Sequence, residues 1–228
     1  MLIRWYGQSA FLLRGEGTVF IDPFGEMEAL AARGLQFDYP PIADVEADVL
    51  LVTHEHGDHN AVEVVGGAPE ILRSKAGTFE SPVGEVVGVA SEHDDVAGTK
   101  HGSNTIFRFA LDGLRVCHLG DFGQASLRPE QERAIGEIDV LILPVGGGST
   151  VGGESAAAVV RALPPRLVVP MHYRTAAVNF LDPPDAFLDA LGAGVERLGQ
   201  SELEAEQLLG TADDPTVALL AAPVTTIA

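Results

Sequence analysis

Three histidines and an aspartate that could bind metal ions lie within six residues of this 228-residue chain, in the segment HEHGDH at 54–59. The segment directly follows the apolar run DVLLVT at 48–53, which predicts a strand. Side chains at positions i and i+2 of an extended chain point the same way, and a turn at Gly57 would swing the next two towards a second position. One short loop could therefore serve two adjacent metal ions. We predict a metal site here and not a polar surface turn.

Three further candidate ligands follow other predicted strands, at 85–91, 114–120 and 166–171. Because parallel-type sheets place their ligand sites at the carboxyl ends of strands, we expect these side chains to join the 54–59 loop. All candidates together give five imidazoles and two carboxylates, the number required for two metals joined by a bridging carboxylate. The candidate ligands are His54, His56, Asp58, His59, His93, Asp121 and His172.

The elements that must position these residues change in kind along the chain. Short alternating or apolar runs predict strands in the first half, and helix-type segments alternate with apolar strands from about residue 128. This order fits an α/β fold with two sheets covered by helices on both faces, in a single domain over 1–228. The predicted strands are 2–6, 9–14, 18–22, 48–53, 85–91, 104–111, 114–120, 139–145, 166–171 and 216–223, and the predicted helices are 128–138, 153–163, 183–193 and, short and acidic, 201–210.

The charge of the chain limits its partners. Fourteen Lys plus Arg stand against 33 Asp plus Glu, a net charge of −19, with 46% hydrophobic residues. A charge of this size repels nucleic acid and anionic lipid, and no cluster of Lys or Arg reverses it. Apolar runs such as VALLAAPV at 217–224 are too short for a transmembrane helix of ~20 residues. We therefore expect a small-molecule substrate, no nucleic acid and no membrane, and a homo-oligomer stays open.

Cysteine usage and the start of the chain concern the compartment. The chain has a single cysteine, Cys117, and begins with a strand-like pattern where a leader would show a basic and then an apolar region. Both features predict a cytoplasmic protein. Cys117 lies in a predicted strand and is expected to be a small buried hydrophobe.

The THEHGDH motif at 53–59 and the order of the later ligands resemble the metallo-β-lactamase superfamily over essentially the whole chain. The resemblance implies a four-layer αββα sandwich, an α/β (α+β) fold with the metals at one edge. It also implies a role for each ligand: a first metal held by His54, His56 and His93, a second by Asp58, His59 and His172, and a bridge by Asp121.

Three longer motifs are similar to a branch of small stand-alone hydrolases within that superfamily. The branch contains the ascorbate-6-phosphate lactonase and is related to the N-acyl-phosphatidylethanolamine phospholipase D enzymes. The motifs indicate a subgroup and leave the substrate open. They are IRWYGQSAFLLRGEG followed by IDP, LPVGGGSTVGGESA, and VVPMHYRT.

An imidazole-rich site with a few carboxylates suits two divalent metal ions, with Zn²⁺ expected and Mn²⁺ or Fe²⁺ as alternatives. Such a pair would supply a bridging hydroxide near neutral pH and stabilise the oxyanion formed by its attack. Asp58 is the predicted catalytic residue, because it would orient this hydroxide and receive a proton. The predicted reaction is hydrolysis of an ester, lactone, amide or phosphoester.

Other functions fit the same pattern less well. Di-iron redox members of the superfamily place a carboxylate where this chain has His56. A non-catalytic metal-binding module would be expected to have lost ligands, and a nuclease would need a basic stripe. The glycines of VGGGSTVGG lack the Lys-Ser/Thr of a phosphate-binding loop, so we expect them to pack closely beside the metal site.

Several polar residues are candidates for work beside the metals. Arg174 suits a phosphate or carboxylate group of a substrate, and His118 could instead support a ligand. Asp22, in the IDP sequence, is expected to brace the metal loop. Substrate selection is expected in the segments 23–47 and 173–182. The predicted substrate contacts are Tyr173, Arg174, His118 and His101.

Overall fold

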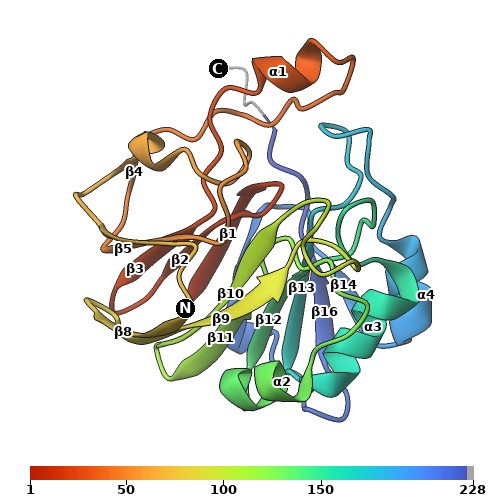
Figure 1. Ribbon diagram of the computed structural model, residues 1–228. Coiled ribbons are helices and arrows are strands. Elements are labelled where there is room, and N and C mark those ends of the chain that lie inside the picture. The colour runs from red at the N-terminus through yellow and green to blue at the C-terminus, as the bar shows by residue number, and fades with distance from the viewer. Residues whose placement is uncertain (225–228) are drawn as a thin grey trace.

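The computed structural model describes residues 1–224, apart from the side chains of Ala29 and Ala31. Within this range the strands form a six-stranded sheet, an eight-stranded sheet and a small two-stranded one (Figure 1). In the six-stranded sheet the order is β15 (Glu202–Glu204), β1 (Leu2–Gly7), β2 (Ala10–Arg14), β3 (Thr18–Ile21), β5 (Val49–Val52) and β7 (Glu70–Arg73). The two-stranded sheet pairs β4 (Val45–Glu46) with β6 (Val65–Gly66).

The eight-stranded sheet has an antiparallel half and a parallel half. Strands β8 to β11 pair antiparallel, and β11, β12, β13, β16 and β14 pair parallel. Its order is β14 (Gly194–Arg197), β16 (Thr216–Leu219), β13 (Leu167–Met171), β12 (Val140–Pro144), β11 (Leu114–His118), β10 (Ser103–Leu111), β9 (Gly84–Glu92) and β8 (Gly77–Ser81).

The two large sheets pack on each other through one apolar core. On the six-stranded side, alternate residues of β1 and β2, such as Trp5, Phe11 and Leu13, enter this core. Phe107 and Phe109 of β10 enter it from the eight-stranded side. Strands β5, β12 and β13 are buried at every position, as expected for strands covered on both faces.

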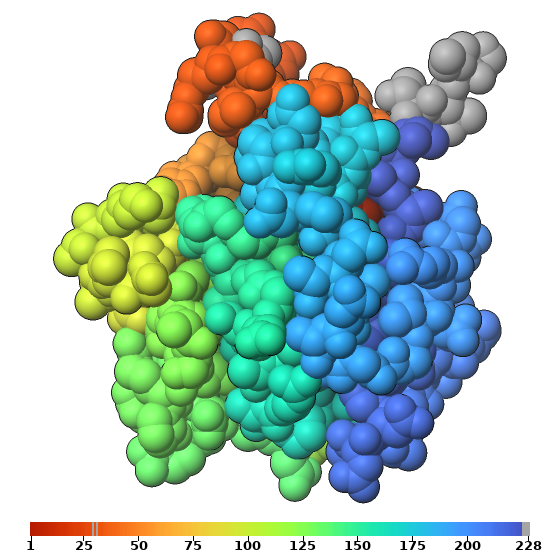
Figure 2. Space-filling view, turned by 90° about the vertical axis from the view of Figure 1, so that its right-hand side faces the viewer, coloured from red at the N-terminus to blue at the C-terminus, as the bar shows by residue number. Residues whose placement is uncertain are grey.

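Three helices cover the outer face of the eight-stranded sheet, which Figure 2 shows in green to blue. They are α2 (Pro129–Ile135), α3 (Gly153–Ala162) and α4 (Asp185–Leu191), and they confirm the helices predicted at 128–138, 153–163 and 183–193. Helix α3 turns Ala156, Val159 and Val160 inwards. Helix α4 ends at Gly192, whose φ of +68° suits glycine.

The opposite outer face is covered mainly by irregular chain. Leu12, Phe20 and Leu50 point outwards from β2, β3 and β5 and pack against the segments 24–47 and 177–181. The turn-rich sequence here forms one short helix, α1 (Glu28–Ala31), which projects above the body of the molecule (Figure 1). The helical layer expected on this side is therefore reduced to loop structure, with the 3-10 turn η1 (Val62–Val64) beside it.

The acidic helix predicted at 201–210 is wrong. Residues 202–204 form β15, which pairs antiparallel with the start of β1, and a 3-10 turn, η2 (Ala205–Gln207), follows. Tertiary pairing at a free sheet edge overrides the helix preference of the Glu- and Leu-rich sequence. None of the described helices is long and apolar enough to cross a membrane.

Candidate metal centre

The loop after β5 brings its four candidate ligands to the edge where strands of the other sheet also end. Three groups of side chains place their potential ligand atoms within 4.8 Å of one another. All seven predicted ligands therefore lie together, in one cluster built from both large sheets. The groups are His54, His56 and His93; His54, His59 and Asp121; and Asp58, His59 and His172.

Asp121 lies at the centre of the cluster. Its Oδ2 atom is 3.3 Å from Nε2 of His59, 3.2 Å from Nε2 of His93 and 3.2 Å from Nε2 of His172. One carboxylate oxygen thus faces three imidazole nitrogens that come from three different parts of the chain. Asp121 therefore lies beside candidate ligands of both predicted metal positions, and the bridging role stays a prediction.

The donor set fits divalent metal ions. His54, His59, His93, Asp121 and His172 are buried, and His59 Nε2 makes no hydrogen bond within the described part of the chain. Buried polar atoms are normally paired, so an unpaired nitrogen facing two carboxylates fits a position meant for a cation. Imidazole and carboxylate are also ligands that Zn²⁺ and similar ions accept.

Hydrogen bonds fix three of the imidazoles so that Nε2 faces the cluster. His59 Nδ1 lies 3.0 Å from Asp22 Oδ2, and His93 Nδ1 lies 3.2 Å from the carbonyl oxygen of Ser149. Both partners can only accept, so Nδ1 carries a proton and Nε2 is the nitrogen left to face a metal ion. His54 Nδ1 contacts Thr53 Oγ1 at 3.0 Å, leaving its Nε2 on the cluster side as well.

Asp22 braces the metal loop, as the sequence predicts. Its carboxylate accepts hydrogen bonds from the backbone nitrogen of Thr53 at 2.8 Å and from Thr53 Oγ1 at 2.7 Å, besides the contact to His59. Asp22 is fully buried and has a φ of +50°. A non-glycine residue held in this conformation is strained, and such strain concentrates at functional sites.

Asp121 is held by a residue that sequence reasoning missed. Asn104 Oδ1 accepts a hydrogen bond from the backbone nitrogen of Asp121 at 3.0 Å, while its Nδ2 donates to the carbonyl oxygen of Leu119 at 2.8 Å. Gly120, which lies between Leu119 and Asp121 in the chain, has a φ of +56°, and a Cβ there would lie 2.4 Å from Asn104 Oδ1. No signal in the sequence links Asn104 to Asp121, because the contact depends on how β10 lies beside β11.

Burial and neighbouring charges shift the pKa values of the cluster residues in different directions. Burial and the neighbouring His59 lower the pKa of His54 to about 2, and burial together with His93 lowers the pKa of His56. Burial acts against the charge of Asp121, but His172 and His59 hold its pKa well below the usual range. Against the same burial effect, Asp121 and Asp58 raise the pKa of His59 well above its usual value. Asp58 and Asp121 therefore stay ionised, as ligands of a cation must.

Two predicted substrate contacts are buried and fully engaged within the protein. The hydroxyl of Tyr173 donates to the carbonyl oxygen of Leu220 at 3.2 Å, and its ring packs against Trp5 in the core. His118 is fully buried, with Nε2 on the carbonyl oxygen of Ser9 at 3.1 Å and Nδ1 accepting from the backbone of Gly120 at 3.1 Å. Neither side chain has a free polar atom for a substrate, so both predictions are corrected.

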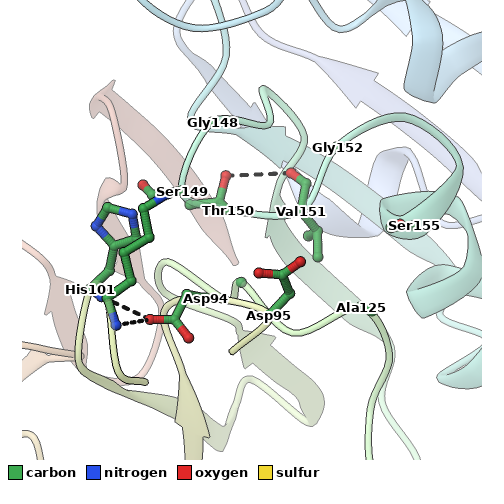
Figure 3. A pocket seen from close by; sticks show the side chains of 12 residues that line it. Asp94, Asp95, His101, Ala125, Gly148, Ser149, Thr150, Val151, Gly152 and Ser155 are labelled. Carbon is green, nitrogen blue, oxygen red and sulfur yellow. Dashed lines mark hydrogen bonds between the residues drawn. The ribbon is translucent and has the colours of Figure 1, made fainter. Parts of the chain in front are cut away.

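The other two predicted contacts have accessible positions. Arg174 is exposed, and its Nε donates to the carbonyl oxygen of Leu181 at 2.6 Å. His101 has its ring centroid 5.5 Å from that of His93 and lines a pocket of about 220 Å³. Figure 3 shows this pocket between two loops, with His101 beside Ser149. The pocket therefore adjoins the metal cluster.

The burial of His118 leads to a prediction on pH. Burial lowers the pKa of His118 from 6.5 to about 4. The unfolded chain then binds more protons than the folded one between these values, so stability from this group is present above pH 6.5 and is lost as the pH falls towards 4. The loss amounts to about 3 kcal/mol at most.

The measurement is urea unfolding of metal-free protein at pH 7 and pH 4.5, compared between wild type and His118→Gln. His118→Gln cannot gain this proton and should lose less stability on acidification. Other titrating groups, such as His54, contribute equally to both proteins. An equal loss of unfolding free energy in wild type and His118→Gln would show that His118 is not the source of this pH dependence.

The fold and this cluster define the metallo-β-lactamase class of metal-dependent proteins. Residues 2–172 match the model of the Beta-lactamase superfamily domain, and the chain belongs to this family.

Cys117 is not part of the cluster. It is fully buried in β11, and burial raises the pKa of its thiol, so the side chain is a small buried hydrophobe as the sequence predicts.

Relatives and solved structures narrow the class. The chain is 33% identical to a UPF0173 metal-dependent hydrolase of Thermococcus kodakarensis over 204 residues, 76% of this chain and 84% of that one. A Thermotoga maritima protein assigned as a Zn-dependent hydrolase of the metallo-β-lactamase superfamily has a TM-score of 0.75 and 34% identity, covering 96% of this chain and 98% of its own. With these relatives, the protein is a metal-dependent hydrolase.

A solved structure of lower sequence identity is similar to this chain in its fold only. CmlA, a diiron β-hydroxylase of Streptomyces venezuelae, has a TM-score of 0.61 and 15% identity, covering 97% of this chain and 53% of its own. The resemblance to the ascorbate-6-phosphate lactonase branch stays a prediction.

Proposed function

We propose that the protein hydrolyses an ester, lactone, amide or phosphoester bond of a small molecule with two divalent metal ions, Zn²⁺ being the expected metal. The observation that carries the proposal is the convergence of three imidazole nitrogens on Asp121 Oδ2. When bound, such ions supply a hydroxide near neutral pH and polarise the bond to be cleaved. One ion would be held by His54, His56 and His93, the other by Asp58, His59 and His172, and both by Asp121.

Asp58 is the proposed catalytic residue. It and His56 are the ligand candidates that solvent reaches, since Asp58 is half-buried and His56 is exposed. A substrate would therefore approach from their side. Burial opposes the charge of Asp58, but His59 holds the pKa of Asp58 below its usual range, so the carboxylate is ionised and can bind a cation or accept a hydrogen bond from a hydroxide.

The pocket beside His93 is the proposed place for the part of the substrate that is not cleaved. Its loop is held by Asp94, whose carboxylate accepts hydrogen bonds from four backbone nitrogens between residues 96 and 101. Lys100, His101 and Ser155 add polar groups to the lining. About 220 Å³ suits a small polar group better than a polymer.

The test is the metal content of untagged protein, prepared without chelators and measured by plasma mass spectrometry, together with a panel of ester, lactone, amide and phosphodiester substrates. We expect about two Zn or Mn per chain and hydrolysis of one bond class. His59→Ala should lose both metal and hydrolysis, because this imidazole faces Asp58 and Asp121.

Other outcomes would contradict the proposal. Two Fe per chain without hydrolysis would favour a redox enzyme on the same fold. A protein that stays free of metal after reconstitution would leave a non-catalytic binding module.

A further inference from the structure

The turn between β1 and β2 reaches the metal cluster from a distant part of the sequence. It consists of Gln8 and Ser9 and follows Gly7, the last residue of β1, before which the β1–β2 register shifts. Gly7 has a φ of +112°, and a Cβ there would lie 2.4 Å from the ring of Tyr39. The turn is therefore packed tightly, and it belongs to the IRWYGQSAF motif, whose polar residues have no role in the function proposed above.

Both polar side chains of the turn contact candidate ligands. Gln8 Nε2 donates to Asp58 Oδ2 at 3.2 Å, and Ser9 Oγ donates to Asp121 Oδ1 at 3.1 Å. Gln8 is 1% exposed and Ser9 is fully buried. The backbone nitrogen of His172 donates to the carbonyl oxygen of Gln8 at 3.3 Å. The turn thus contacts three of the seven candidates.

These contacts fall on one half of the cluster. Asp58 and His172 belong to the half completed by His59, and Asp121 is shared by both halves. Within residues 1–224, no hydrogen bond from this turn reaches the half formed by His54, His56 and His93.

The conformation of the turn is costly. Gln8 has a φ of +49° and His172 a φ of +50°, and the backbones of these two strained residues are bonded to each other. Gln8 Oε1 is buried and has no hydrogen-bond donor among residues 1–224. An unpaired buried oxygen and a left-handed non-glycine residue both oppose folding, and both are typical of positions kept for a function.

We propose that Gln8 is a positioning residue that holds Asp58 in place for the metal ion of the Asp58, His59 and His172 half. Its Nε2 fixes one carboxylate oxygen of a half-buried side chain that could otherwise turn to solvent. Trp5 Nε1 and the backbone nitrogen of His172 both donate to the backbone carbonyl oxygen of Gln8, so the backbone from which the side-chain amide extends is fixed. The inference rests on the proposed function, because it assumes two metal positions.

The experiment titrates metal-free protein with Co²⁺ and follows its visible absorption, which reports on each metal position. Wild type should bind two equivalents. In Gln8→Met, which is similar in length but donates no hydrogen bond, one equivalent should bind as in wild type. The other should bind about 10- to 100-fold more weakly. Gln200→Met, at an exposed glutamine, is the matched control and should titrate as wild type.

Each other outcome is decisive. Two unchanged equivalents in Gln8→Met, or equal weakening of both, would overturn the positioning role. Fewer than two equivalents in wild type would instead overturn the dinuclear site of the proposed function. The thermal midpoint of metal-free Gln8→Met shows whether it folds. Should it not fold, Gln8→Glu keeps the size and lacks the N–H towards Asp58, and an unchanged or tighter second equivalent there overturns the inference.

Discussion

Asp121→Asn is expected to lower the rate of hydrolysis by more than about 100-fold. A loss of about 100-fold is the largest expected for a residue that only supports a metal ligand. The carboxylate faces three imidazole nitrogens at 3.2 to 3.3 Å through one oxygen. In the variant, an NH₂ group in place of that oxygen would donate to the imidazole lone pairs and remove the negative charge. The shared ligand of both halves would be gone, while the shape of the side chain is kept.

The measurement for Asp121→Asn is the specific activity on the best substrate of the panel, with metal content determined on the same sample. Asp213→Asn makes the same chemical change at an exposed position and should retain full activity. An Asp121→Asn protein with two bound ions and near wild-type turnover would show that Asp121 does not bridge.

Asp22→Asn is expected to weaken metal binding about 10- to 100-fold although Asp22 belongs to none of the three ligand groups. The Asp22 oxygen that faces His59 Nδ1 at 3.0 Å also accepts from Thr53 Oγ1. Asparagine can keep one acceptor for the backbone of Thr53, but its NH₂ group would then face His59. The imidazole would have to accept at Nδ1 and carry its proton on Nε2, where the lone pair is needed.

Equilibrium titration with Zn²⁺ against a competing chelator measures this loss. Asp48→Asn is the control, since Asp48 accepts from the backbone nitrogen of Thr18 at 2.8 Å on the same pair of strands but at an exposed position. Equal affinities in Asp22→Asn and wild type would show that Asp22 does not set the orientation of His59.

The candidate ligands could be found in the sequence because four of them are neighbours and the rest follow strands. A ligand at a strand end is placed by the strand itself, so apolar runs were enough to predict that His93, Asp121 and His172 would meet the 54–59 loop. The three main helices could be predicted from their own sequences, and in α3 and α4 apolar residues recur along the side that is buried.

The residues that hold the ligands could not be predicted in this way. Ser9 and Asp121 are 112 positions apart, and Asn104 reaches Asp121 only because β10 and β11 are paired. His118 has the residue type of a ligand, but its strand turns it into the core. The segment 201–210 has the composition of a helix, and the free edge of β1 makes part of it a strand. In each case packing between distant segments decides.

The candidate ligands come from both large sheets. The loop 54–59 follows β5 of the six-stranded sheet, whereas Asp121 and His172 follow β11 and β13 of the eight-stranded sheet. The site therefore cannot exist until the two sheets have docked, and an ion bound there would act as a cross-link between them. Catalysis and the attachment of the two sheets to each other would then depend on the same few atoms.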